Sequence, residues 1–297
     1  MSSPKCLSEA PDSASSFFRF LWIYVGLFAL TAVIVPTGAV ILLGDQASNH
    51  ALLISTAAQV GVILVYSLVV LRGTKHHPLL WARPGGKAII CGVSSGVFVF
   101  VVARLLVDGI RWISVAWSSD FSLVPVVDGM TRRSFAVALL LLAVVPAFCE
   151  ELFYRVTVLT LMKRWRPAVL VVVSSLAFAL VHLPQGWAAM VCAAILGYVL
   201  MKDYAKHQNY LWVVLVHFVY NALDLYFTYR RYWVSDGVYI SRRAASGSEC
   251  AFWGLLYIAG AIIVVVITVT VQMLWESRHR AARPAMLTGS SRLVTHR

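Results

Sequence analysis

Long apolar runs separated by short polar segments recur along the whole sequence, and they constrain the fold more than any other feature. A helix needs about 20 predominantly apolar residues to cross a bilayer, and most of the runs approach or exceed that length. The residue-by-residue alternation of a transmembrane β-strand is absent. Of the 297 residues, 60% are hydrophobic and only 13% are charged, which is too apolar for an ordinary soluble domain. The sequence therefore predicts an all-α, polytopic membrane protein.

We expect about eight transmembrane helices in one bundle. Their predicted ranges are Phe18–Leu43, Ala51–Leu71, Ala88–Val107, Phe135–Met162, Ala168–Leu183, Trp187–Met201, Leu211–Tyr229 and Ala251–Trp275. The bundle forms a single membrane domain over residues 17–276. A polar tail over residues 1–16 precedes it, and a basic tail over residues 277–297 follows it.

The distribution of basic residues predicts the orientation of the chain. The formal net charge is +12, and Lys and Arg are more numerous in the segments that would share a side with the N-terminus. The positive-inside rule then favours both termini in the cytoplasm, with a plasma or bacterial inner membrane as the expected location. Residues 108–134 are expected to form an outer loop, either an ordinary loop with interfacial tryptophans or one that holds an amphipathic segment on the membrane surface. Loop topology accounts for the charge, so we infer contact with membrane lipids and no binding of nucleic acid.

Only a few ionisable or amide side chains lie inside the predicted spans. A charged group there costs about 2.5–3.5 kcal/mol on insertion scales, and by default it indicates a functional site. The fourth span contains three of these residues, the fifth ends with one, and the seventh holds three: Glu150, Glu151, Arg155, His182, His217, Asn221 and Asp224.

Helical spacing predicts how these side chains are grouped. Glu151 and Arg155 are four residues apart and can form an ion pair, whereas Glu150 is turned about 100° away from that pair. His217, Asn221 and Asp224 form one stripe on the seventh span, and we interpret Asp224 as orienting His217. At about 1.5 Å per residue, the groups on the three helices fall within one slab about 12 Å thick. We therefore predict a shared site between helices four, five and seven.

Three motifs in this region resemble a known family. They are EExxxR at Glu150 to Arg155, FxxxH at Phe178 to His182, and HxxxN at His217 to Asn221. In this order, and each on its own apolar helix, they are similar to the motifs of the CPBP family of intramembrane proteases, which includes the type II CAAX prenyl endopeptidases. The resemblance covers about residues 135–229. It implies an intramembrane endopeptidase that hydrolyses a peptide bond of a membrane-associated or lipidated substrate.

The chemistry that the resemblance implies can be assigned to individual residues. Hydrolysis needs an activated water, a donor for the oxyanion and an acid for the leaving amine. Glu150 is the candidate general base, and His182 would share the water. His217 and Asn221 would stabilise the oxyanion. Arg155 would hold Glu151 charged and fix the helix around Glu150.

The participation of a metal stays open at this point. Glu150, His182 and His217 would make a His₂Glu set suited to catalytic zinc. The short-spaced HExxH arrangement is missing, and we favour a site without a cofactor.

Other functions were weighed against the protease. A non-catalytic membrane scaffold or immunity-type factor could use the polar cluster to bind a partner. A proton-coupled transporter could use it as a proton relay, but no paired halves with broken helices occur in the sequence. Residues Gly92 to Gly96 fit GxSxG, with Ser94 at the nucleophile position. They also fit GxxxG, and the apolar helical context favours helix packing.

Overall fold

The computed structural model describes residues 13–30, 41, 60–61, 63–69, 71–72, 85–117, 132–162, 165–183, 187–234 and 247–281. Nearly all of these residues are helical, which confirms the all-α prediction. Four helices in this part of the chain are long and apolar enough to cross a membrane: Gly86–Ser114, Phe135–Leu161, Tyr210–Phe227 and Gly247–Leu274. The chain is therefore an integral membrane protein. Much of the first two predicted spans lies outside the described residues, so the count of eight stays a prediction.

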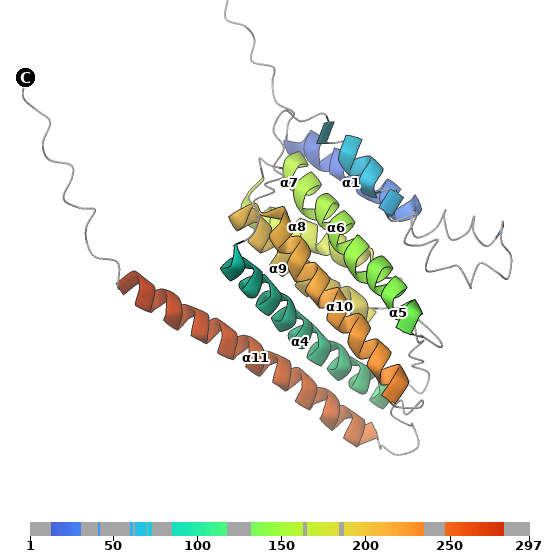
Figure 1. Ribbon diagram of the computed structural model, residues 1–297, viewed down its shortest axis with the longest axis vertical. Coiled ribbons are helices and arrows are strands. Elements are labelled where there is room, and N and C mark those ends of the chain that lie inside the picture. Colours follow the sequence, from blue (N-terminus) through green and yellow to red (C-terminus); the bar gives the residue numbers. More distant parts are fainter. Residues whose placement is uncertain are drawn as a thin grey trace, which may run out of the picture.

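The described helices form a bundle, with α1 at one side, α11 at the other, and α4 between α10 and α11 (Figure 1). A continuous helix from Arg132 to Leu161 corresponds to the predicted fourth span, and two π-helical stretches interrupt its α-helical geometry. In chain order the elements are α1 (Ser13–Ala29), α4 (Gly86–Trp117), α5 (Arg132–Leu139), η3 (Leu140–Val144), α6 (Val145–Glu151), η4 (Leu152–Thr157), α7 (Val158–Leu161), α8 (Pro167–Leu180), α9 (Trp187–His207), α10 (Tyr210–Val234) and α11 (Gly247–Ala281).

The predicted end of the third span is wrong, because α4 continues to Trp117. Residues 108–117 were expected in the outer loop, with or without an amphipathic segment, and they are instead the last turns of α4. The extra turns are stabilised in two ways. Arg104 and Asp108 form an ion pair of 2.9 Å along the helix, which compensates both charges. The same turns also pack closely against α11 at Gly109.

Small residues bring α4 close to its neighbours on two sides. A Cβ atom at Gly96 would lie 2.7 Å from the Cβ of Val219 on α10, and one at Gly254 on α11 would lie 2.8 Å from the carbonyl oxygen of Gly109. Real Cβ atoms do not approach so closely, so glycine is required where these helices cross. The structure therefore supports the packing interpretation of Gly92 to Gly96 and gives α4 a central place between α10 and α11.

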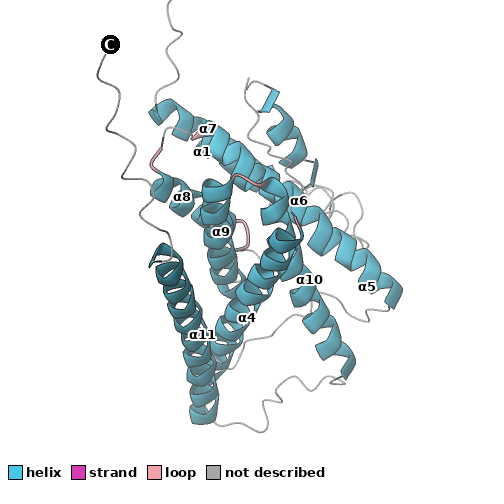
Figure 2. Cartoon of the chain, turned by 60° about the vertical axis from the view of Figure 1, so that its left-hand side comes forward, coloured by secondary structure: helices cyan, strands magenta, loops and turns pink. Residues whose placement is uncertain are grey.

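Tight connections set the direction of the helices that carry the motifs. Pro167 opens α8 in the first helical turn, where its missing N–H costs nothing. Gln208 has a φ of 48°, and this left-handed residue ends α9. Asn209 then caps α10, because its side-chain oxygen accepts a hydrogen bond of 3.1 Å from the N–H of Trp212. This short turn leads the chain directly into α10, which runs along α5 and α6 in both views (Figures 1 and 2).

Candidate active site

The helix that carries Glu150 is irregular on both sides of that residue. Pro146 stands near the start of α6, and the π-helical stretch η3 directly precedes it. Proline removes one backbone donor and crowds the carbonyl four residues earlier, and a wider turn relieves this conflict. A second wide turn, η4, follows Glu151. Such turns occur frequently at functional sites.

A buried ion pair lies immediately after Glu150. The Nε of Arg155 is 2.9 Å from the Oε2 of Glu151, and both side chains are 0% exposed, as the four-residue spacing predicted. The contact is an ion pair rather than an aligned hydrogen bond. The guanidinium carbon also lies 4.8 Å from the centre of the Phe178 ring, in cation–π geometry. The Arg155 charge is therefore held by a carboxylate on one side and an aromatic face on another.

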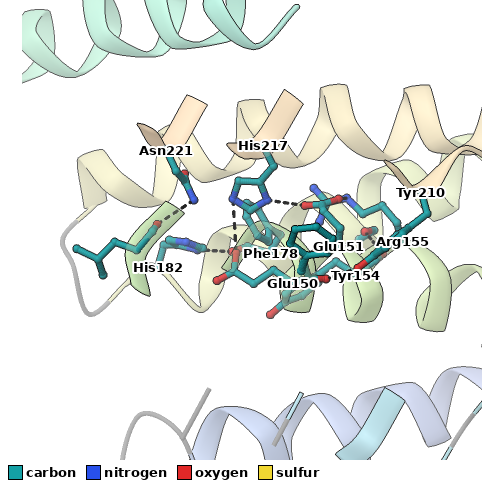
Figure 3. A network of polar contacts seen from close by, with 12 residues as sticks. Glu150, Glu151, Tyr154, Arg155, Phe178, His182, Tyr210, His217 and Asn221 are labelled. Atoms are coloured by element: carbon teal, nitrogen blue, oxygen red, sulfur yellow. Dashed lines mark hydrogen bonds and ion pairs between the residues drawn. The ribbon is translucent and has the colours of Figure 1, made fainter. Parts of the chain in front are cut away.

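The same carboxylate holds His217 (Figure 3). The Nδ1 of His217 is 2.7 Å from the Oε1 of Glu151. A carboxylate in this position accepts a hydrogen bond from Nδ1–H and fixes the tautomer, so the Nε2 atom faces Glu150. The distance from Nε2 to the Oε2 of Glu150 is 3.8 Å, and Glu150 is only 3% exposed. This distance is too long for a direct hydrogen bond, but a water to one side of the line between the two atoms can reach both of them.

The structure corrects the interpretation of Asp224. This residue does not orient His217, because the ring nitrogens of His217 face Glu151 and Glu150. Asp224 instead lies 3.5 Å from Arg104 on α4, and its side chain is 52% exposed. The prediction failed because the spacing along α10 shows which residues share a face but not which neighbouring helix that face meets.

Phe178 connects the two histidines. Its ring centre lies 4.8 Å from that of His182 and 5.7 Å from that of His217. The Nδ1 of His182 is 2.8 Å from the carbonyl oxygen of Phe178, in the last turn of α8. Because a carbonyl can only accept, His182 donates from Nδ1 and caps this helix end, which directs its Nε2 away from the helix backbone. Phe178 is thus part of the packing of both imidazoles and of Arg155.

Three side-chain donors from α8 and α10 hold backbone carbonyls of the irregular helix. The Tyr210 hydroxyl donates to Phe148 at 2.6 Å, the Ser174 hydroxyl to Tyr154 at 2.8 Å, and the Asn221 amide to Leu142 at 3.2 Å. Tyr210 and Ser174 were not among the site residues predicted from the sequence. Spacing could have found both, because Ser174 precedes Phe178 by four residues and Tyr210 precedes His217 by seven.

The described side chains do not form a metal-ligand set. Within the part of the chain that the structure describes, no three His, Cys, Asp or Glu side chains converge so that they could hold a metal ion. Glu150, His182 and His217 therefore do not form, in this arrangement, the His₂Glu set that a zinc ion would need. The expectation of a site without a cofactor stays a prediction.

A comparison with protein families identifies the segment that carries this site. Residues 132–223 match the family model described as type II CAAX prenyl endopeptidase Rce1-like. The family resemblance is confirmed. All six predicted site residues, from Glu150 to Asn221, lie within the CAAX-protease-like segment. No curated protein and no solved structure matches the chain.

The match gives the coarse class of activity. A CAAX-protease-like segment points to a protease, and hence a hydrolase, that works in a membrane. The apolar helices around the segment agree with this class. The structure gathers Glu150, Glu151, Arg155, His182 and His217 around Phe178 and places Asn221 one helical turn further along α10 (Figure 3).

Proposed function

We propose that this protein is an intramembrane endopeptidase in which Glu150 activates a water molecule for attack on a peptide bond. The observation that carries the proposal is the 3.8 Å gap between the Oε2 of Glu150 and the Nε2 of His217. A water beside these two atoms can hydrogen bond to the carboxylate and the imidazole at once. The Glu150 carboxylate could then take a proton from the water while the His217 imidazole holds the water in position.

Each residue of the network has a part in the proposed reaction. Glu150 takes a proton from the water as its oxygen attacks the carbonyl carbon, and later delivers that proton to the leaving amine. His217 positions the water and, when protonated on Nε2, donates to the oxyanion. Glu151 fixes the His217 ring through the 2.7 Å contact, and Arg155 compensates the charge of Glu151. His182 provides a second imidazole beside Phe178 that shares the water or the substrate carbonyl.

The substrate is proposed to be a membrane-associated or lipidated protein or peptide. The matched family description names a prenyl endopeptidase, which supports a lipidated substrate. Membrane lipids would surround the described apolar helices, many of whose large side chains are exposed. We further propose a multi-pass arrangement with both termini in the cytoplasm, because of the distribution of Lys and Arg.

Proteolysis by the purified full chain in detergent tests the function. Peptides with and without a prenyl group would be offered to the wild type, to Glu150→Gln and to Glu249→Gln. Glu249 is an exposed carboxylate in the first turn of α11 and serves as the matched control. The proposal expects Glu150→Gln to lose cleavage while its thermal unfolding midpoint stays at the wild-type value. The Glu249 variant should cleave normally.

Two results would overturn the proposal. Equal cleavage by the wild type and Glu150→Gln would remove Glu150 from the mechanism. Absence of cleavage on every peptide, with a partner-dependent phenotype that survives Glu150→Gln, would favour the scaffold interpretation. Proton-coupled uptake by reconstituted vesicles would favour the transporter.

A further inference from the structure

The helix that carries the site loses one backbone hydrogen bond at Pro146. Pro146 lies in α6, directly after the π-helical stretch η3, and in the α-helical register of α6 the N–H of residue 146 would donate to the carbonyl oxygen of Leu142; proline has no N–H. The carbonyl oxygen of Leu142 therefore lacks its ordinary donor. In an apolar membrane helix a backbone carbonyl without a donor costs free energy, since no bulk water is present to replace it.

Asn221 replaces the missing donor from a neighbouring helix. Its side-chain Nδ2 donates to the carbonyl oxygen of Leu142 at 3.2 Å, across a separation of 79 residues in the sequence. Asn221 lies one turn beyond His217 on the same face of α10. One face of α10 thus holds the irregular helix at two points. Asn221 holds it before Glu150 at Leu142, and His217 holds it after Glu150 at Glu151.

We infer that Asn221 is a positioning residue that compensates for Pro146, rather than a donor to the oxyanion. By fixing the wide turn η3 against α10, it sets the separation between Glu150 and His217. Its effect on cleavage rests on the proposed function, whereas its effect on stability does not. Two features that the sequence presents separately, a proline in a membrane helix and the last residue of HxxxN, become one structural unit.

A double-mutant cycle on stability tests the unit without any reference to catalysis. The four proteins are the wild type, Pro146→Ala, Asn221→Ala and the double variant, compared by thermal unfolding in one detergent. We expect Asn221→Ala to lower the midpoint in the Pro146 background. In the Pro146→Ala background the restored N–H can satisfy Leu142, so the loss should shrink to about half or less.

A matched cycle provides the control. Ser174→Ala removes another buried hydrogen bond to the same helix, the one to Tyr154, which does not involve Pro146. Ser174→Ala should lower the unfolding midpoint by the same amount in the Pro146 protein and in the Pro146→Ala protein. An Asn221→Ala cost that is also the same in both backgrounds would overturn the inference. Should Pro146→Ala not fold, Pro146→Leu restores the same N–H, and the same comparison applies.

Cleavage by the same proteins separates positioning from catalysis. Removal of an oxyanion donor costs about 10²–10³ in kcat, and a proline substitution cannot restore that donor. If Asn221 is a positioning residue, kcat should be lower in Asn221→Ala and should recover in the double variant. A double variant that regains stability but not turnover would place Asn221 in contact with the reacting atoms and overturn the inference. If the wild type cleaves no peptide, the proposed function fails, but the stability cycle still tests whether Asn221 compensates for Pro146.

Discussion

The hydroxyl of Tyr210 donates a 2.6 Å hydrogen bond to the carbonyl oxygen of Phe148, two residues before Glu150. Tyr210 is the first residue of α10, and Phe148 lies in α6. The bond therefore ties the start of the helix that carries His217 to the helix that carries the proposed base. Because it acts at the backbone, it holds the position of Glu150 without contacting its side chain.

Replacing Tyr210 with Phe should lower turnover more than it lowers stability. Loss of one buried hydrogen bond costs about 1 kcal/mol of unfolding free energy. If the displacement of Glu150 raises the activation free energy by a similar amount, kcat should fall by about tenfold, with little change in KM. Kinetics on a cleavable peptide, beside thermal unfolding, measure both quantities. Tyr226→Phe is the control, because Tyr226 lies on α10 and is exposed. Wild-type kcat in Tyr210→Phe would contradict the role.

Removing one partner of the buried ion pair should be more damaging than removing both. Arg155→Met leaves the Glu151 carboxylate buried without its cation, which costs about 3–5 kcal/mol. The double variant Glu151→Leu with Arg155→Met leaves no unpaired charge and should recover much of the stability. It should not recover cleavage, because His217 would lack the carboxylate at its Nδ1. Unfolding midpoints and cleavage rates of both variants measure this, and equal stability of the two would refute it.

Gly197 should be intolerant of substitution because it faces the Phe178 ring. A Cβ there would lie 3.2 Å from both the Cδ1 of Phe178 and the Cα of Ser175. Gly197→Ala should cost about 1–3 kcal/mol through overpacking and reduce cleavage by displacing a ring that both histidines contact. In the matched variant Gly260→Ala, the new Cβ meets its nearest neighbour at 3.9 Å, so stability should hold or rise. Normal cleavage by Gly197→Ala would show that the ring position is unimportant.

Cleavage should survive treatment with a chelator. Among the described residues no three His, Cys, Asp or Glu side chains converge so that they could hold a metal ion. The test measures peptide cleavage before and after dialysis against a chelator, followed by zinc addition. Loss of cleavage that zinc restores would contradict the metal-free mechanism and require a rearranged ligand set.

The sequence predicts contacts within one helix better than contacts between helices. The Glu151–Arg155 pair follows from four-residue spacing, and the structure contains it. The contact of His217 with Glu151 joins residues 66 apart, and its geometry depends on how two helices are rotated about their axes. Spacing along α10 could not give that rotation, which is why Asp224 was assigned to His217.

The hydrophobic pattern of the sequence also could not predict the irregular backbone of this helix. The predicted range of the fourth span is close to the observed helix, but hydrophobicity does not reveal that two of its stretches are π-helical. Pro146 was the available signal, since a proline within an apolar helix requires a compensating donor and a change in geometry. Likewise, the hydrogen bond from Ser174 to Tyr154 is visible only when α8 is seen against η4.

The two wide turns, η3 and η4, make the number of residues in the helix from Arg132 to Leu161 as important as its composition. A π-helical turn contains one more residue than an α-helical turn, so every side chain beyond it is rotated by about 100° from its place in an uninterrupted helix. Deleting Val156 or Thr157, the two residues of η4 after Arg155, could convert it to a regular turn while leaving EExxxR unchanged. The part of the helix after the deletion would then present different side chains to α8. The arrangement of side chains around Phe178 thus depends partly on the number of residues in η4, and a motif search does not count the residues of η4 that follow Arg155.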